Sequence, residues 1–239
     1  VEMLFDATGT SGVPAAMSKL FQNFLAWSVA PNDQVARRAV IEQADAAAQS
    51  FRQTAAGLMQ ASADADTAAR GILANINRLA AQIREGNIEI RRNVASAQDP
   101  GMDANMQATL EELAEYVDFT ALKADDGTYT VFLGGQTPLV VGDRQYNVDL
   151  VISNQSIVVR DEQGADITGQ LHRGRLSGLL EYRNTLIPSY LGDPNRMAAA
   201  FANRVNGILA TGLAPAAQHP LFTYGAAGTE AATLAVTAI

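Results

Sequence analysis

An apolar repeat with heptad spacing runs without interruption from residue 41 to residue 90, inside a proline-free stretch from residue 33 to residue 91. Small and apolar residues alternate at intervals of three and four, the pattern of a helix that buries one face against other helices. We call these positions the seam. Its two columns are Ile41, Ala48, Ala55, Ser62, Ala69, Ile76, Ile83 and Ile90, and Ala44, Phe51, Leu58, Ala65, Ile72, Leu79 and Gly86. No charged residue enters the seam and no proline interrupts it, so it predicts one long helix.

The length of this helix constrains the architecture. About 59 residues at 1.5 Å each extend roughly 88 Å, whereas a compact chain of this size is about 45 Å across. The best candidate for a hairpin, residues 61–66, contains neither Gly nor Pro. We therefore expect an elongated helical rod or bundle. Packing within the chain is the first interpretation of the seam, and a coiled coil between subunits is the second.

A shorter helix is predicted before the seam, over residues 13–28. Pro31 then breaks the chain, with Asn32 as the N-cap of the long helix and Asp33 in its first turn, where the helix dipole favours negative charge.

Breaker residues divide the rest of the helical sequence. Pro100-Gly101 predicts a loop over residues 96–103, followed by another helix. Pro188 should kink or end the helix that starts near Gly174. Gly192-Asp193-Pro194 predicts a stop and a restart, with Asp193 as cap and Pro194 in the first turn. Residues 213–239 are expected to form a loop and a short strand.

Between the helices the apolar period changes from 3.6 to two. Short alternating segments are separated by turn signals at Asp126-Gly127, Gly134-Gly135 and Gly142-Asp143. They predict four to six strands, the last near Ile167, in a small antiparallel meander or barrel-like sheet.

The predicted fold class is α+β, mainly α, with a small antiparallel β subdomain inserted in a helical rod. Residues 1–117 and 173–212 would form the rod, residues 118–172 the β subdomain, and residues 213–239 the remaining segment. Whether the helix over 174–212 passes unbroken through 192–195 is left open.

Charge and composition exclude several classes of protein. The 239 residues carry 17 basic and 25 acidic side chains, for a net charge of −8. This balance argues against nucleic acid or an anionic membrane as a partner. The chain has no Cys and two His, which removes disulfides and thiolate metal sites. We find no membrane-spanning segment and no signal peptide, and the start at Val1 suggests an excised fragment.

No motif predicts a catalytic, cofactor-binding or metal-ligating residue. His172 and His219 are isolated, and we interpret each as surface polarity. Asp125-Asp126-Gly127 lacks the ligand order of an EF-hand and is read as a hairpin turn. Gly134-Gly135 lacks the Lys-Ser/Thr of a phosphate loop. Residues 9–12 resemble a nucleophile elbow only superficially.

Two other features have structural interpretations. Trp27 is expected to pack between helices, with a role as an interface anchor as the alternative. Arg84, Arg91 and Arg92 lie near the C-terminal end of the long helix, where the dipole favours cations, and phosphate binding is the alternative.

Three stretches, in this order, resemble the family of flagellar hook-associated protein 1 (FlgK), the hook–filament junction proteins. Residues 21–53 resemble the family's helix, short break and long helix. Residues 125–146 are similar to its hairpin with a VFLGG…PLV core, and residues 174–191 to its G-x-L-x-G-L-L-x-x-R return helix. The interruption at 192–195 departs from that pattern, and segments are missing at both ends.

The resemblance implies a structural protein of the bacterial flagellum at the junction between hook and filament. It implies self-assembly, contacts with the hook protein and adjacent junction or filament proteins, and an export chaperone that binds through the missing termini. It also implies type III export without a cleaved signal, an extracellular location, and no catalysis, cofactor or metal.

The alternatives are another flagellar axial protein, of the flagellin or hook-associated protein 3 type, and a glycosidase that uses two carboxylates. No pair of carboxylates stands out in the sequence. An adhesin-like module would need an exposed aromatic patch, and 6% of the residues are aromatic.

Overall fold

The computed structural model describes residues 11–92, 99–153, 155–212 and 219–237. The chain divides into two compact units: unit 1 comprises Val1–Ser62 and Ile187–Ile239, and unit 2 comprises Ala63–Leu186. Six α-helices, eight strands, one 3₁₀ turn and one π-helical turn are assigned in the described residues. The chain is thus mainly α with small antiparallel sheets, as predicted.

The predicted long helix is α2, Gln34–Arg92, a single helix of 59 residues. The seam is buried at all but three positions, Ile41, Ser62 and Gly86. Its N-terminal part contributes to the core of unit 1 and its C-terminal part to the core of unit 2. The seam therefore packs within the chain, as the first interpretation states.

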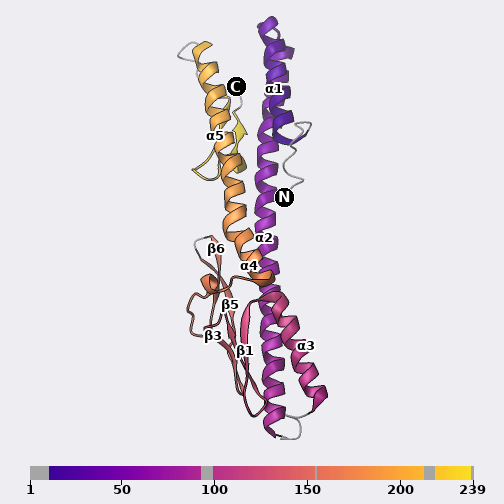
Figure 1. Cartoon of the computed structure of the whole chain (residues 1–239). Coiled ribbons are helices and arrows are strands. Elements are labelled where there is room, and N and C mark those ends of the chain that lie inside the picture. Colours follow the sequence, from indigo (N-terminus) through magenta and orange to yellow (C-terminus); the bar gives the residue numbers. More distant parts are fainter. Residues whose placement is uncertain (1–10, 93–98, 154, 213–218, 238–239) are drawn as a thin grey trace. The chain divides into compact units, whose positions relative to one another are not determined.

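Unit 1 is helical. The N-terminal part of α2 lies alongside α1 (Gly12–Val29), and α5 (Ile187–Gly212) packs on it through Phe51 and Phe201, whose ring centroids are 5.9 Å apart (Figure 1). The C-terminal segment adds α6 (Glu230–Thr233) and the antiparallel pair β7 (Phe222–Thr223) and β8 (Ala235–Val236).

Unit 2 contains the predicted β segment. A meander in the order β1-β2-β3-β4 comprises Phe119–Lys123, Tyr129–Leu133, Thr137–Val141 and Arg144–Gln145. A separate hairpin pairs β5 (Asp149–Ser153) with β6 (Ser156–Arg160). The turn η3 (Thr168–Gln170) follows, and Ile167, expected in a last strand, lies beside an isolated bridge between Arg160 and Asp166.

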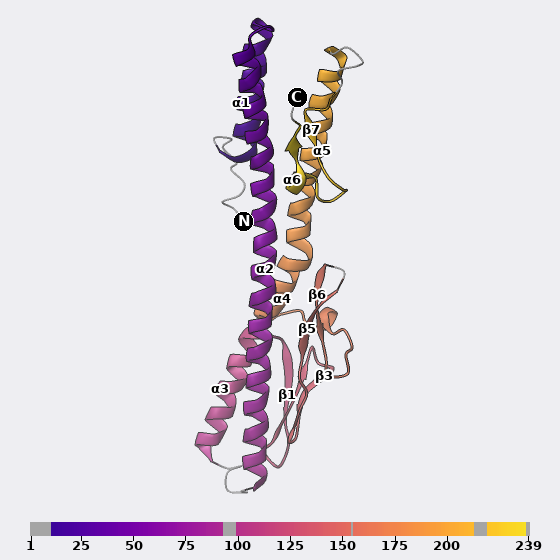
Figure 2. The same ribbon diagram turned by 180° about the vertical axis from the view of Figure 1, so that it is seen from behind.

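Helices and strands together form the core of unit 2. The C-terminal part of α2 lies between α3 (Pro100–Tyr116) and the strands (Figures 1 and 2). The helix α4 (Gly174–Glu181) and the π-helical turn η4 (Tyr182–Leu186) complete the unit. Apolar residues of α2, α3, α4 and the strands form one continuous core. The strands of unit 2 therefore share their core with helices of the same unit.

Two predicted helix starts were wrong by one to a few residues along the chain. The cap of α2 is Asp33 and not Asn32, because the Asp33 carboxylate accepts the backbone N–H of Val35 at 2.8 Å. Pro100-Gly101 does not form a loop. It opens α3, with Asp99 as N-cap and proline in the first turn, where its missing N–H costs no helical hydrogen bond.

The predicted stop at Gly192-Asp193-Pro194 was also wrong, because α5 runs through all three residues. Pro194 and Asn195 lie on its buried face, and the Asn195 amide bonds Gly228 C=O and Ala231 N–H at 2.8 and 2.9 Å. These tertiary contacts outweigh the local tendency of Gly192 and Pro194 to interrupt a helix.

Pro188 does not end the helical run. It is the second residue of α5, and the π-helical turn η4 immediately precedes that helix. Proline has no N–H to donate to the carbonyl four residues earlier, that of Asn184, so the regular α pattern is altered at this point.

Candidate functional site

The two histidines are not brought into any polar site. His172 and His219 are both exposed, and they belong to different units. Within the described parts of the chain, no group of three or more His, Asp or Glu could hold a metal ion. None of the helices in those parts is both long and apolar enough to cross a membrane.

The acidic turn at 125–127 connects β1 and β2 as predicted. The Asp126 carboxylate accepts the backbone N–H of Thr128 at 3.0 Å and its hydroxyl at 2.6 Å. The hydroxyl, followed by the backbone N–H, holds the pKa of Asp126 below its usual value. Gly127 has φ +87°, which favours glycine. These contacts are those of a hairpin turn.

Gly134-Gly135 joins β2 to β3, and both residues have positive φ, +54° and +77°. They form the expected turn. The stretch 9–12 falls partly outside the described residues, and α1 begins at its last residue, Gly12.

Trp27 and Arg91 make contacts within their own units. Trp27 is half-buried against the core of unit 1, and its indole N–H donates to Pro31 C=O at 3.1 Å. Arg91 and Arg92 lie in the last turn of α2, and Arg91 approaches the carboxylates of Asp126 and Asp143 at 3.8 and 3.9 Å.

Helical asparagines join strands and loops to the helices, and periodicity in the sequence does not predict these contacts. In each of four cases the side-chain amide donates to the C=O and accepts from the N–H of one residue, as a neighbouring strand would. We call these contacts amide clasps. They pair Asn77 with Val148, Asn87 with Tyr129, Asn184 with Ile157, and Asn206 with Phe222.

The clasp at Asn87 is buried and has a third bond. Its Nδ2 donates to Tyr129 C=O and Gly142 C=O, both at 2.7 Å, and its Oδ1 accepts Tyr129 N–H at 2.7 Å. Ala124 N–H donates to Thr128 C=O, so the peptide groups of Tyr129 face away from β1. Asn87 therefore satisfies groups that the β ladder leaves unpaired.

A signal for this clasp was present in the sequence. Asn87 falls beside the apolar seam on the long helix, and a polar side chain at a buried helical position needs hydrogen-bond partners. The identity of those partners was not readable, because Tyr129 lies 42 residues away in sequence.

A buried ion pair supports the clasp at η4. Arg183 Nε donates to Asp66 Oδ1 at 2.7 Å, and the two side chains are 10% and 17% exposed. The Arg183 guanidinium also donates to Gln155 C=O at 2.9 Å, where Gln155 has φ +66°. The neighbouring Asn184 clasps Ile157 on β6, so this turn fixes the β5–β6 hairpin.

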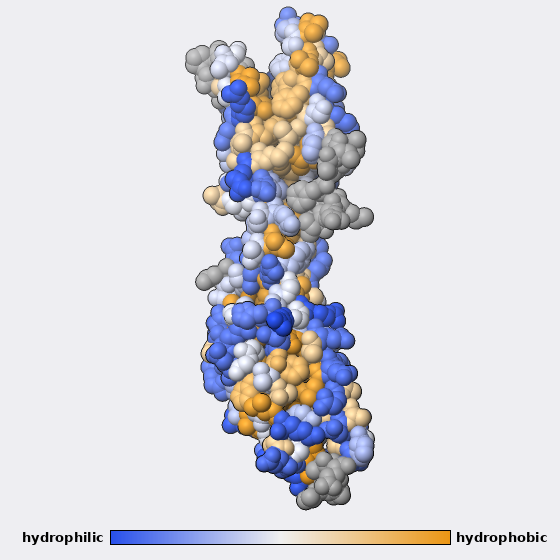
Figure 3. Space-filling view, in the orientation of Figure 1, coloured by the Kyte–Doolittle hydropathy of each residue, from blue (hydrophilic) through white to orange (hydrophobic). Residues whose placement is uncertain are grey.

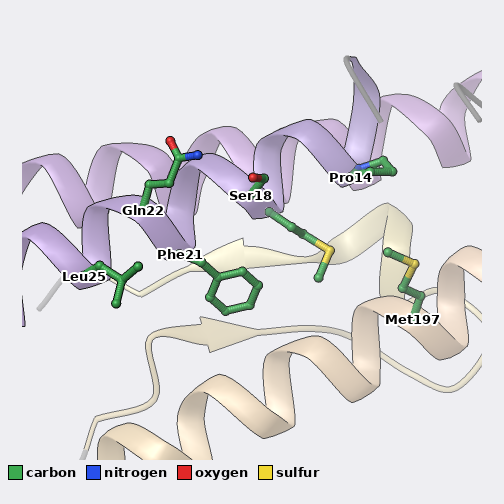
Figure 4. A pocket seen from close by; sticks show the side chains of 7 residues that line it. Pro14, Ser18, Phe21, Gln22, Leu25 and Met197 are labelled. Atoms are coloured by element: carbon green, nitrogen blue, oxygen red, sulfur yellow. The ribbon is translucent and has the colours of Figure 1, made fainter. Parts of the chain in front are cut away.

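An apolar groove in unit 1 is the most evident candidate for an interaction surface. It holds about 500 Å³. Its lining comprises Pro14, Met17, Ser18, Phe21, Gln22, Leu25 and Met197, none of them charged. Phe21 and Met197 extend into the space between α1 and α5 (Figure 4), and apolar residues gather over these two helices (Figure 3).

The groove continues into an exposed apolar strip along α1. Phe21, Leu25 and Val29 recur every four residues along α1 and are 47%, 68% and 86% exposed. An exposed apolar strip of this kind is suited to contact with another protein surface.

Comparisons with known proteins agree with this architecture. The chain is similar to the structure of the flagellar hook junction protein FlgK from Burkholderia pseudomallei, with a TM-score of 0.76 and 21% identity. The match covers 86% of this chain and 38% of that one, so the chain spans well under half of the related structure. No curated protein matches the chain. The family described as the flagellar hook-associated protein FlgK helical domain matches residues 1–222, and the chain therefore belongs to this family.

Proposed function

We propose that this chain is the helical domain of a structural subunit of the bacterial flagellum, which forms the junction between hook and filament and performs no catalysis. The observation that carries the proposal is the family match over residues 1–222. The similar fold of the FlgK hook junction protein supports it. The long helix and the buried seam suit a load-bearing part, because a helix transmits force along its backbone hydrogen bonds.

The partners follow from this role. The subunit would contact other copies of itself, the hook protein, and adjacent junction or filament proteins. We place it outside the cell in the flagellum, exported by the type III apparatus without a cleaved signal and accompanied by a chaperone. Residues 118–172 would act as a β subdomain carried by the helical domain.

A deletion of the encoding gene tests the role. The mutant should carry hooks without filaments and release flagellin into the medium, because the filament has no base to grow on. The full-length gene on a plasmid should restore filaments. Normal filaments on the mutant would contradict the proposal. Bare hooks with no flagellin in the medium would instead indicate that the protein is itself a filament subunit.

A further inference from the structure

The sequence contains one Asn-Gly pair, Asn206-Gly207, and it lies in α5 at an amide clasp. Asparagine followed by glycine is the sequence most prone to deamidation, because glycine has no Cβ to hinder approach of its backbone nitrogen. We propose that Asn206 is a modification site: it deamidates when the C-terminal end of α5 opens, and the product releases Phe222 from the helix.

The reaction needs no enzyme or cofactor. The backbone nitrogen of Gly207 attacks the side-chain carbonyl carbon of Asn206, a C–N bond forms, and ammonia leaves with the nitrogen's proton. The resulting succinimide is opened by one water molecule to aspartate or isoaspartate. No oxidation or reduction takes place.

The folded structure restrains this attack in two ways. The Asn206 Nδ2 donates to Phe222 C=O at 2.8 Å, and its Oδ1 accepts Phe222 N–H at 2.9 Å. Both polar atoms of the amide are therefore engaged. In addition, the α-helical backbone commits the Gly207 N–H to a hydrogen bond within the helix, away from the side chain. Reaction requires that the clasp and the local helix open together.

The position of Asn206 makes such opening local. It lies six residues before the end of α5 at Gly212, and Gly207 and Gly212 both have low helix propensity. Helix ends open more readily than helix centres. Deamidation at Asn206 is thus expected to report the opening of this end of α5.

The product cannot restore the clasp. An aspartate at 206 still accepts Phe222 N–H, but it has no proton to donate to Phe222 C=O and places a negative oxygen against it. Phe222 is 1% exposed, and its ring lies 5.0 Å from that of Phe201. It therefore anchors β7, and the loss of half its clasp should loosen the β7–β8 pair.

The first experiment measures deamidation in the whole 239-residue chain by peptide mass mapping. Samples are incubated at mildly alkaline pH, in native buffer and in denaturing urea. In urea, Asn206 should convert before every other asparagine, and native buffer should slow it at least about tenfold. Gly207→Ala should suppress conversion in both conditions. An added Cβ at Gly207 meets no atom within 4 Å, so this variant should fold normally.

The second experiment tests the consequence by hydrogen exchange in two variants. Asn206→Asp should speed exchange of the Phe222 amide at least about tenfold, whereas Asn105→Asp, with the same charge change at an exposed site of α3, should not. Three results would overturn the proposal: equal conversion of Asn206 in native buffer and in urea, faster conversion of another asparagine in urea, or unchanged Phe222 exchange in Asn206→Asp.

Discussion

The clasp at Asn87 should be among the largest side-chain contributions to the stability of unit 2. Asn87→Ala removes three hydrogen bonds at a fully buried position and leaves the N–H and C=O of Tyr129 and the C=O of Gly142 without that partner. Each buried polar group left unsatisfied costs about 1–3 kcal/mol. Water entry and the higher helix propensity of alanine offset part of this cost. The expected loss is about 3–5 kcal/mol in the free energy of unfolding.

Urea unfolding followed by far-UV circular dichroism measures this loss. The urea concentration at the unfolding midpoint should fall, while the slope of the unfolding free energy against urea concentration stays the same. The matched control is Asn75→Ala on the same helix, since Asn75 is half-buried and makes no side-chain hydrogen bond in the described structure. That control should change stability by less than about 0.5 kcal/mol. Asn87→Asp, which can accept but not donate near neutral pH, should also destabilise strongly. If Asn87→Ala lay within about 1 kcal/mol of the control, the clasp would not be a major support of the sheet.

Three further predictions concern single residues. Gly71→Ala should stabilise by about 0.5–1 kcal/mol in urea unfolding, because Gly71 is exposed within α2 and an added Cβ meets no atom; a loss of stability would contradict this. Gly134→Ala should destabilise by about 2 kcal/mol or more, because φ is +54° and the Cβ would lie 2.5 Å from Gln170 C=O; a neutral result would be inconsistent with the turn. The pKa of Asp126 is lowered mainly by the hydrogen bond from the Thr128 hydroxyl. The Asp126 carboxylate therefore stabilises the fold fully above the unfolded-state pKa, and this stabilisation is lost as pH falls through the folded-state pKa. NMR titration should show the pKa of Asp126 rising toward its usual value in Thr128→Val.

The sequence predicted the features that depend on periodicity. The proline-free stretch 33–91, which contains the seam, predicted the length of α2 to within one residue at each end, against Gln34–Arg92 in the structure. Alternation and turn residues located the antiparallel meander, because period two and positive-φ glycines are local properties of the chain. The buried face of α2 was predicted on the same basis.

Features that depend on contacts between distant segments were not predicted. The helix through Pro194 persists because Asn195 bonds the segment from Gly228 to Ala231, more than 30 residues away. The clasps at Asn77 and Asn87 likewise depend on a loop and a strand that are placed against α2 only in the folded chain. Local propensity cannot show these contacts, because the partners are defined by the tertiary structure.

The location of the full-length protein on living cells tests the proposed role most directly. The chain contains no cysteine, so Glu111→Cys on the exposed side of α3 offers a defined attachment point for a membrane-impermeant maleimide dye. The unsubstituted strain controls for cysteines elsewhere in the protein. We expect one labelled spot on each flagellum, where the hook meets the filament. Label along the whole filament, or no label on cells that contain the protein, would contradict the account.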